Sequence, residues 1–134
     1  MPVNVLLITH QEVGTALLQA ATNTLGELPL ATTVISVNED TDPETLLPRL
    51  QQFASQIDRG QGLLILTDLY GSTPSNIAAS LQEPANIRVI AGLNLPMLIR
   101  VMNYANLALP ELAQKALSGG KDGIINCTKE SHDK

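Results

Sequence analysis

The feature that most constrains this chain is an apolar run, Leu63–Leu66, which ends at Thr67-Asp68. A run that is apolar at every position is typical of a strand buried on both faces, as in a parallel sheet covered by helices on both sides. Downstream lie the turn-like residues Tyr70–Thr73 and then Pro74, which suits the start of a helix because its missing N–H is not needed there. The segment therefore predicts a buried strand that delivers Asp68 to its carboxyl end, beside a turn that opens a helix.

This turn has the composition of an anion-binding site. Its small and polar residues are Gly71, Ser72, Thr73, Ser75 and Asn76. The free backbone N–H groups at the start of a helix carry partial positive charge and bind phosphate readily. Helix capping by Ser72 or Thr73 explains one of these residues, and the number of further donors favours phosphate. We expect the five residues to form a phosphate-binding turn, with Tyr70 as either a contact at its mouth or a simple lid.

The rest of the chain alternates between predicted strands and predicted helices. Strands are expected at 3–8, 32–37, 63–66 and 87–91, and a short last one at 123–127. Helices are expected at 13–25, from 42 or 43 to 57, at 74–81, 96–106 and 110–119. This alternation predicts an α/β fold: a doubly wound, mainly parallel sheet in the order 2-1-3-4, with helices on both faces.

Proline and glycine residues set some of the expected helix limits. Pro48 is expected to kink the second helix or to delay its start, because proline lacks the N–H that a helix interior needs. Gly119-Gly120 is expected to stop the last helix. A second strand-to-helix turn, Gly92–Pro96, is open to two interpretations, helix capping by Asn94 or phosphate binding, with capping slightly favoured.

The predicted strand order brings His10 and Asp68 together. His10 ends the first strand and Asp68 ends the third, and these strands are neighbours in the order 2-1-3-4. A neutral imidazole is nucleophilic at one nitrogen when the other donates its proton to a carboxylate. We therefore expect His10 to be the reactive group and Asp68 to support it, with a ring nitrogen roughly 2.6–3.2 Å from a carboxylate oxygen.

Composition excludes several other classes of function. The 134 residues fit one domain, and a net charge of −5 with only 2% aromatic residues argues against nucleic acid as a partner. Two His and one Cys without ligand spacing make a metal site improbable, and no GxxxxGK[ST] motif is present. No cofactor is expected, and His132 lies in a polar tail. The apolar run 5–8 is too short to span a bilayer, and the lone Cys127 fits a cytoplasmic protein.

Three segments together resemble one protein family: Leu7–His10 (LITH), Thr67–Asn76 (TDLYGSTPSN) and Ala91–Leu98 (AGLNLPML). The family is the IIA component of the mannose/fructose/sorbose class of the bacterial phosphoenolpyruvate-dependent sugar phosphotransferase system (PTS). The resemblance covers about residues 1–127, which implies a mannose-type IIA domain followed by a polar tail, 128–134. It implies a cytoplasmic phosphotransferase with a phosphohistidine intermediate, needing no cofactor.

The resemblance also implies roles and partners. His10 would accept a phosphoryl group from the histidine-containing phosphocarrier protein and pass it to a IIB component, with Asp68 in the supporting role. A membrane IIC/IID complex would be served indirectly. The family also forms homodimers that exchange a C-terminal strand, which residues 123–127 match.

One departure from the family pattern and two alternative functions accompany this interpretation. The family often has a small residue directly after the histidine, whereas Gln11-Glu12 follows here and adds a negative charge beside the site. Because the resemblance includes no IIB-like part, a regulatory phosphoprotein, whose His10 phosphorylation state a partner reads, stays open. A flavodoxin-type ligand-binding domain would need ring-stacking aromatic residues that this chain barely has.

Overall fold

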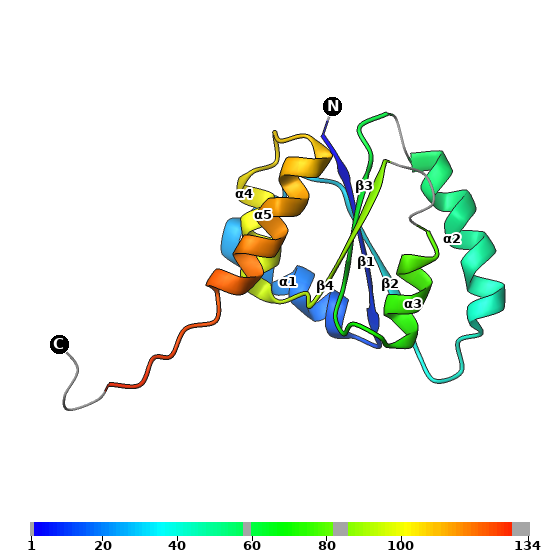
Figure 1. The fold of residues 1–134 in the computed structure, drawn as a ribbon, viewed down its shortest axis with the longest axis horizontal. Coiled ribbons are helices and arrows are strands. Elements are labelled where there is room, and N and C mark those ends of the chain that lie inside the picture. The colour runs from blue at the N-terminus through cyan, green and yellow to red at the C-terminus, as the bar shows by residue number, and fades with distance from the viewer. Residues whose placement is uncertain (1, 58–59, 82–85, 130–134) are drawn as a thin grey trace.

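The fold is a parallel sheet between two layers of helices, seen in a computed structural model that describes residues 2–57, 60–81 and 86–129 (Figure 1). Along the chain the elements are β1 (Asn4–His10), α1 (Val13–Leu25), β2 (Thr32–Val37), α2 (Pro43–Ile57), β3 (Leu63–Thr67), α3 (Thr73–Ala79), β4 (Ile87–Ala91), α4 (Leu95–Asn103) and α5 (Leu109–Asp122). All strand pairs are parallel, in the order β2-β1-β3-β4. The predicted fold class and strand order are confirmed.

The two faces of the sheet carry separate apolar layers. Helices α1, α4 and α5 cover one face, and α2 and α3 cover the other (Figure 1). Side chains alternate along each strand, so that Leu64 and Leu66 of β3 pack in the first layer while Leu63 and Ile65 pack in the second. The apolar run of β3 is thus buried on both sides, which is the physical reason for its continuous hydrophobicity.

The start of α2 is fixed by Asp42. Its Oδ1 accepts a hydrogen bond from the Glu44 N–H at 3.0 Å, and its Oδ2 accepts one from the Thr45 hydroxyl at 3.0 Å. These bonds cap the helix directly before Pro43, one of the two predicted starts. Pro48 lies inside α2 and does not delay its start.

The expectation that Gly119-Gly120 would stop the last helix is wrong, because α5 runs on to Asp122. The reason is packing against α4. A Cβ at Gly119 would lie 2.6 Å from Cβ of Arg100, and one at Gly120 would lie 2.9 Å from Cε of Met97. The two glycines let the helices approach closely, so here they serve helix packing and not termination.

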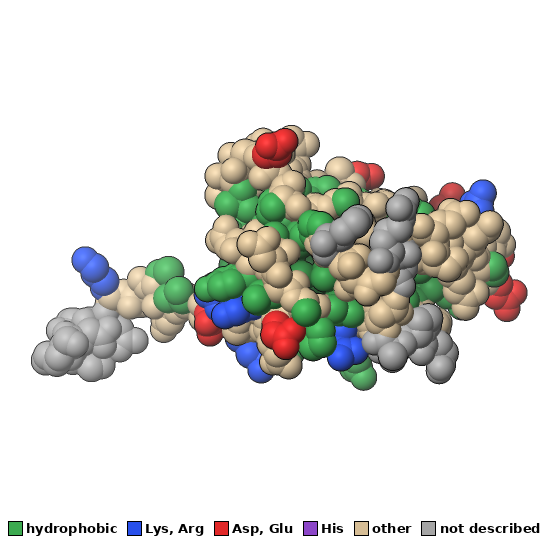
Figure 2. Space-filling model, turned by 90° about the horizontal axis from the view of Figure 1, so that it is seen from above, with side chains coloured by type: hydrophobic (Ala, Val, Ile, Leu, Met, Phe, Trp, Pro, Cys, Tyr) green, Lys and Arg blue, Asp and Glu red, His purple; other side chains and the backbone are tan. Residues whose placement is uncertain are grey.

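The short strand expected at 123–127 is also corrected. Gly123 caps the end of α5, and residues 124–129 form neither helix nor strand within this single chain. The segment projects away from the body, with Ile124 and Ile125 79% and 71% exposed (Figures 1 and 2). A strand needs a neighbouring strand to pair with, and residues 124–129 pair with none of the described strands of this copy. Residues 130–134 of the predicted tail, including His132, lie outside the described residues.

Candidate functional site

The carboxyl ends of β1 and β3 place His10 beside Asp68. The two strands pair in register, with Ile8 opposite Thr67, so His10 and Asp68 both lie just beyond the last pairs. Nδ1 of His10 lies 3.0 Å from Oδ2 of Asp68. The predicted contact is confirmed.

One oxygen of Asp68 holds both the ring and the backbone of His10. The backbone N–H of His10 also donates to Oδ2, at 3.2 Å. Because a carboxylate oxygen only accepts, Nδ1 carries the ring proton and Nε2 keeps a free lone pair. The side chain of His10 is 42% exposed and that of Asp68 only 13%. The His10 side chain is therefore partly open to solvent, while the carboxylate that holds its Nδ1 is mostly buried.

The other oxygen of Asp68 has a different environment. Within the described part of the chain, Oδ1 is buried and has no hydrogen-bond partner, and the hydroxyl of Thr67 is in the same condition. A buried acceptor without a donor is costly, so an unpaired carboxylate oxygen beside His10 calls for a physical explanation such as a catalytic role or a bound water.

The position of His10 also depends on Thr9 and Gly14. The hydroxyl of Thr9, which is fully buried, accepts a hydrogen bond from the Gly14 N–H at 2.8 Å. A Cβ at Gly14 would lie 2.9 Å from that same Oγ1. The first turn of α1 therefore rests directly on the end of β1, and only glycine permits this approach.

Gln11, directly after His10, has an unusual backbone. Its φ is +39°, and among the described residues it is the non-glycine residue with positive φ. This left-handed conformation costs a residue with a side chain about 1–2 kcal/mol. The N–H of Gln11 donates to the carbonyl of Val37 at 3.0 Å, so the turn is tied to the end of β2.

His10 and Gln11 both line a hollow of about 390 Å³ beside β2. Its other walls are the end of β2 at Val37, the loop that follows, the start of α2 at Pro43, and the start of α3 at Thr73 and Pro74. Asn38, Glu39 and Thr41 line it from the loop. Glu39 is exposed and contributes a carboxylate to the wall. The His10 ring thus borders a concave surface that combines polar side chains with apolar ones such as Val37 and Pro74.

The five residues of the predicted phosphate-binding turn are spread over different surroundings. Thr73 lines the hollow with His10, while Asn76 lines another between α2 and α3. Ser75 is buried, and Gly71 is exposed with φ +85°. Ser72 occupies the N-cap position of α3, but its hydroxyl donates to the carbonyl of Leu69 at 2.6 Å and does not cap the helix. Of the five residues, the structure therefore places only Thr73 in the wall of the His10 hollow.

The second turn, at Gly92–Pro96, is structural. Oδ1 of Asn94 accepts a hydrogen bond from the Met97 N–H at 2.9 Å, and its Nδ2 donates to the carbonyl of Gly120 at 3.2 Å. The side chain caps α4 and ties it to α5, which decides between the two interpretations in favour of capping.

Sequence reasoning missed Gln11 and Glu39 as parts of the site. Glutamine carries no signal for a left-handed backbone, and Glu39 reads as an ordinary loop residue until β2 and α2 are placed in space. The sequence signal that could have indicated Gln11 is its departure from the small residue that the family often has after the histidine. Tyr70, whose role was open, is 85% exposed, and the neighbouring Leu69 is 60% exposed.

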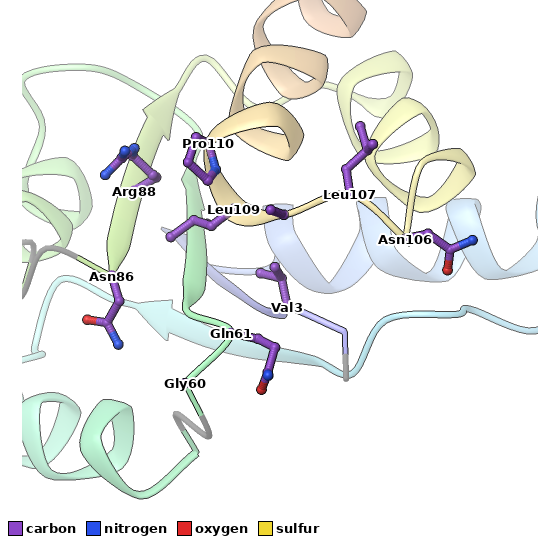
Figure 3. A pocket seen from close by; sticks show the side chains of 10 residues that line it. Val3, Gly60, Gln61, Asn86, Arg88, Asn106, Leu107, Leu109 and Pro110 are labelled. Carbon is purple, nitrogen blue, oxygen red and sulfur yellow. The ribbon is translucent and has the colours of Figure 1, made fainter.

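A larger hollow, of about 500 Å³, lies at the opposite end of the sheet (Figure 3). Val3 and Leu109 contribute its apolar part, and Gln61, Asn86 and Arg88 contribute polar groups. The described residues that line it include neither a histidine nor a carboxylate. His10 lines only the smaller hollow of the two.

Comparison with known proteins places the chain in a family. Residues 4–117 match the family model EIIA-man, described as PTS system fructose IIA component. The chain belongs to this family. It is thus a IIA component of the phosphotransferase system, the family that the sequence motifs indicated.

Individual IIA relatives agree with this assignment. The chain is 28% identical over 127 residues to the mannose-specific EIIAB component of Escherichia coli K12. The aligned region covers 92% of this chain and 39% of that protein. It is 31% identical over 88 residues to the fructose-specific EIIA component of Bacillus subtilis, covering 64% and 60%. The chain thus spans about two fifths of the length of the mannose-specific relative.

Solved structures of IIA proteins share the fold. The mannose/sorbose specific IIA subunit from Enterococcus faecalis superposes with a TM-score of 0.86 at 24% identity, covering 99% of this chain and 100% of that one. The EIIA component from Streptococcus agalactiae superposes with a TM-score of 0.80 at 22% identity, covering 92% and 96%. Across residues 2–57, 60–81 and 86–129, no helix has the length and apolar character to cross a membrane.

Proposed function

We propose that this chain is a phosphocarrier, in which Nε2 of His10 accepts a phosphoryl group from the histidine-containing phosphocarrier protein. The observation that carries the proposal is the contact of His10 Nδ1 with Asp68 Oδ2, at 3.0 Å. It leaves Nε2 as the exposed nucleophile. The phosphoryl group then passes to a IIB component in the cytoplasm, and a membrane IIC/IID complex uses it for sugar uptake.

The transfer needs no cofactor and no net proton movement. The bond between phosphorus and the donor's imidazole nitrogen breaks, and a bond between phosphorus and Nε2 of His10 forms. The positive charge that develops on the ring is stabilised by Asp68, whose carboxylate already holds the Nδ1 proton. The return step, to a IIB component, is the same exchange in reverse.

The surroundings of His10 suit a protein partner. The ring is 42% exposed, and the apolar Leu69 and Tyr70, which follow Asp68, are 60% and 85% exposed. A donor histidine on another protein can therefore reach Nε2 without a channel. Backbone N–H groups of the turn at Ser72–Asn76 are expected to help hold the phosphoryl oxygens, so single side-chain substitutions there should cost less.

The test is phosphorylation with labelled phosphoenolpyruvate and the general phosphotransferase proteins. We expect an acid-labile, base-stable adduct on His10, mapped by mass spectrometry, and no adduct on His10→Ala. Label on Ser72, Thr73 or His132, or label that survives His10→Ala, would contradict the assignment. Adding a purified IIB component then separates two functions: loss of label to IIB supports transport, and label retained until a regulatory partner binds supports the alternative of a signalling phosphoprotein.

A further inference from the structure

Gln11 is held in a conformation that a glycine would adopt more easily. Its φ of +39° lies in the left-handed region, where a Cβ is disfavoured. The hydrogen bond from its N–H to the Val37 carbonyl, at 3.0 Å, ties this conformation to the end of β2. Strain of this kind is concentrated at functional sites, where the surrounding structure maintains it.

The turn changes where the side chain lies. In a regular strand, neighbouring side chains point to opposite faces, so residue 11 would be directed away from His10. With the left-handed turn, His10 and Gln11 line the same hollow. Gln11 is exposed there, and its carboxamide makes no hydrogen bond with the residues that the structure describes, so its NH₂ group is available to a ligand in the hollow.

The charges around the hollow show what such a donor would do. Glu39 lines the wall, and Glu12 follows Gln11 in the chain. The carboxylate of Glu39 disfavours the negative charge of a phosphoryl group in the hollow. A neutral amide donor satisfies a phosphoryl oxygen without adding charge, and the amide can rotate aside for an incoming partner.

We propose that Gln11 is a phosphoryl-binding residue, whose side-chain NH₂ donates a hydrogen bond to an oxygen of the phosphoryl group on Nε2 of His10. This inference rests on the proposed function, because it assumes that His10 is phosphorylated. It goes beyond it by assigning a ligand contact to a residue where the resembling family often has only a small side chain.

The test uses a chemical donor, so that it does not depend on any protein partner. Phosphoramidate transfers its phosphoryl group to histidine: the P–N bond of the reagent breaks, ammonia leaves, and a bond from phosphorus to Nε2 forms. Phosphorylation of the full chain is followed by ³¹P NMR for the wild type, Gln11→Gly and Gln11→Glu. The matched control is Gln19→Glu, which makes the same charge change at an exposed position of α1 outside the hollow.

We expect Gln11→Gly to be phosphorylated about 10-fold more slowly, the usual effect of one lost hydrogen bond to a charged group. Its melting temperature should be equal or higher, because glycine relieves the strained backbone. Gln11→Glu, similar in shape but negatively charged, should be slower still, while Gln19→Glu should match the wild type. The side-chain NH₂ resonances of Gln11 should also shift when His10 is phosphorylated.

Some outcomes would overturn the proposal. A phosphorylation rate of Gln11→Gly within 2-fold of the wild-type rate would do so. So would side-chain NH₂ resonances of Gln11 that do not shift when His10 is phosphorylated. Equal slowing by Gln11→Glu and Gln19→Glu would assign the effect to general charge. A wild type that takes label from phosphoramidate but not from the phosphocarrier protein would contradict the proposed function alone.

Discussion

At the scale of individual residues, one oxygen of Asp68 makes two hydrogen bonds to His10. Oδ2 accepts from the ring of His10 and from its backbone N–H, at 3.0 and 3.2 Å. The backbone bond fixes where the carboxylate lies, and the ring bond fixes which nitrogen is free. The orientation of the His10 ring, the proposed nucleophile, is therefore set before any partner arrives, which is the condition for electrostatic preorganisation.

Replacing this carboxylate should slow the reaction without abolishing it. Asp68→Ala removes the partner of Nδ1 but leaves Nε2 in place, so phosphoryl uptake should fall about 10- to 1,000-fold, or about 1.4–4 kcal/mol. Asp68→Asn, which can still accept a hydrogen bond, should lose less. Rates are measured by rapid quench with labelled phosphocarrier protein. Glu111→Ala, an exposed acidic residue of α5, is the control, and an unchanged rate for Asp68→Ala would remove Asp68 from the site.

The sequence predicted these two residues and missed their neighbour for different physical reasons. His10 and Asp68 each end an apolar strand, and strand order follows from hydrophobic periodicity and crossover handedness, so their meeting was predictable. The conformation of Gln11 is imposed by the tertiary bond to Val37, which leaves no local pattern. The Ser72 hydroxyl could either cap α3 or bond to a nearby backbone carbonyl, and the sequence does not show that it donates to Leu69.

At the scale of elements, the site depends on how closely α1 begins after β1. The N–H of Gly14, in the first turn of α1, donates to the buried hydroxyl of Thr9, the residue before His10. This bond satisfies an N–H at the start of a helix that has no side-chain N-cap. The hydrogen bond thereby ties the end of β1 to the first turn of α1, while His10, the next residue, lines the hollow.

Adding one methyl group at this contact should destabilise the protein. In Gly14→Ala the Cβ would lie 2.9 Å from Thr9 Oγ1 and 3.1 Å from Cγ1 of Val34, so α1 must shift. We expect a loss of about 1–3 kcal/mol in the free energy of unfolding, although alanine favours a helix over glycine. Urea denaturation measures it. Thr15→Ala, at the next, exposed position of α1, should change stability little; a stabilised Gly14→Ala would show that the contact is not tight.

Helix ends were less predictable than strands, and α5 shows why. Two adjacent glycines are a good local stop signal, yet α5 continues through Gly119 and Gly120 because α4 packs against them. The contact is between residues about twenty positions apart, so no local pattern reports it. Asp42 and Asn94, in contrast, cap helices within three residues of themselves, and their roles could be predicted from the sequence.

At the scale of the whole molecule, the segment after α5, residues 124–129, packs into no helix or strand of the single chain. Ile124 and Ile125 are more than two thirds exposed, although β-branched apolar residues are typical of strands. The strand that the sequence predicts here is not paired with any described strand of the same copy. Exchange of this segment between two subunits, as the resemblance implies, remains a proposal that agrees with this exposure.

Removing the segment should therefore change the assembly and not the fold. We expect the full chain to be a homodimer by light scattering at micromolar concentration, and a chain shortened after Gly123 to be a monomer with an unchanged far-UV spectrum. The cut spares α5, which ends at Asp122. Deleting only residues 130–134 is the control and should leave the dimer intact. A full chain that is monomeric would exclude strand exchange.

The sheet also separates the molecule into two parts that can vary independently. Its strands divide the apolar side chains into one layer under α1, α4 and α5 and another under α2 and α3. Buried residues such as Leu112 and Ile77 lie in different layers. The effects of substitutions in the two layers should therefore add, to within about 0.3–0.5 kcal/mol, whereas pairs within one layer should not. A lineage of such proteins can accumulate core changes on one side without having to compensate for them on the other.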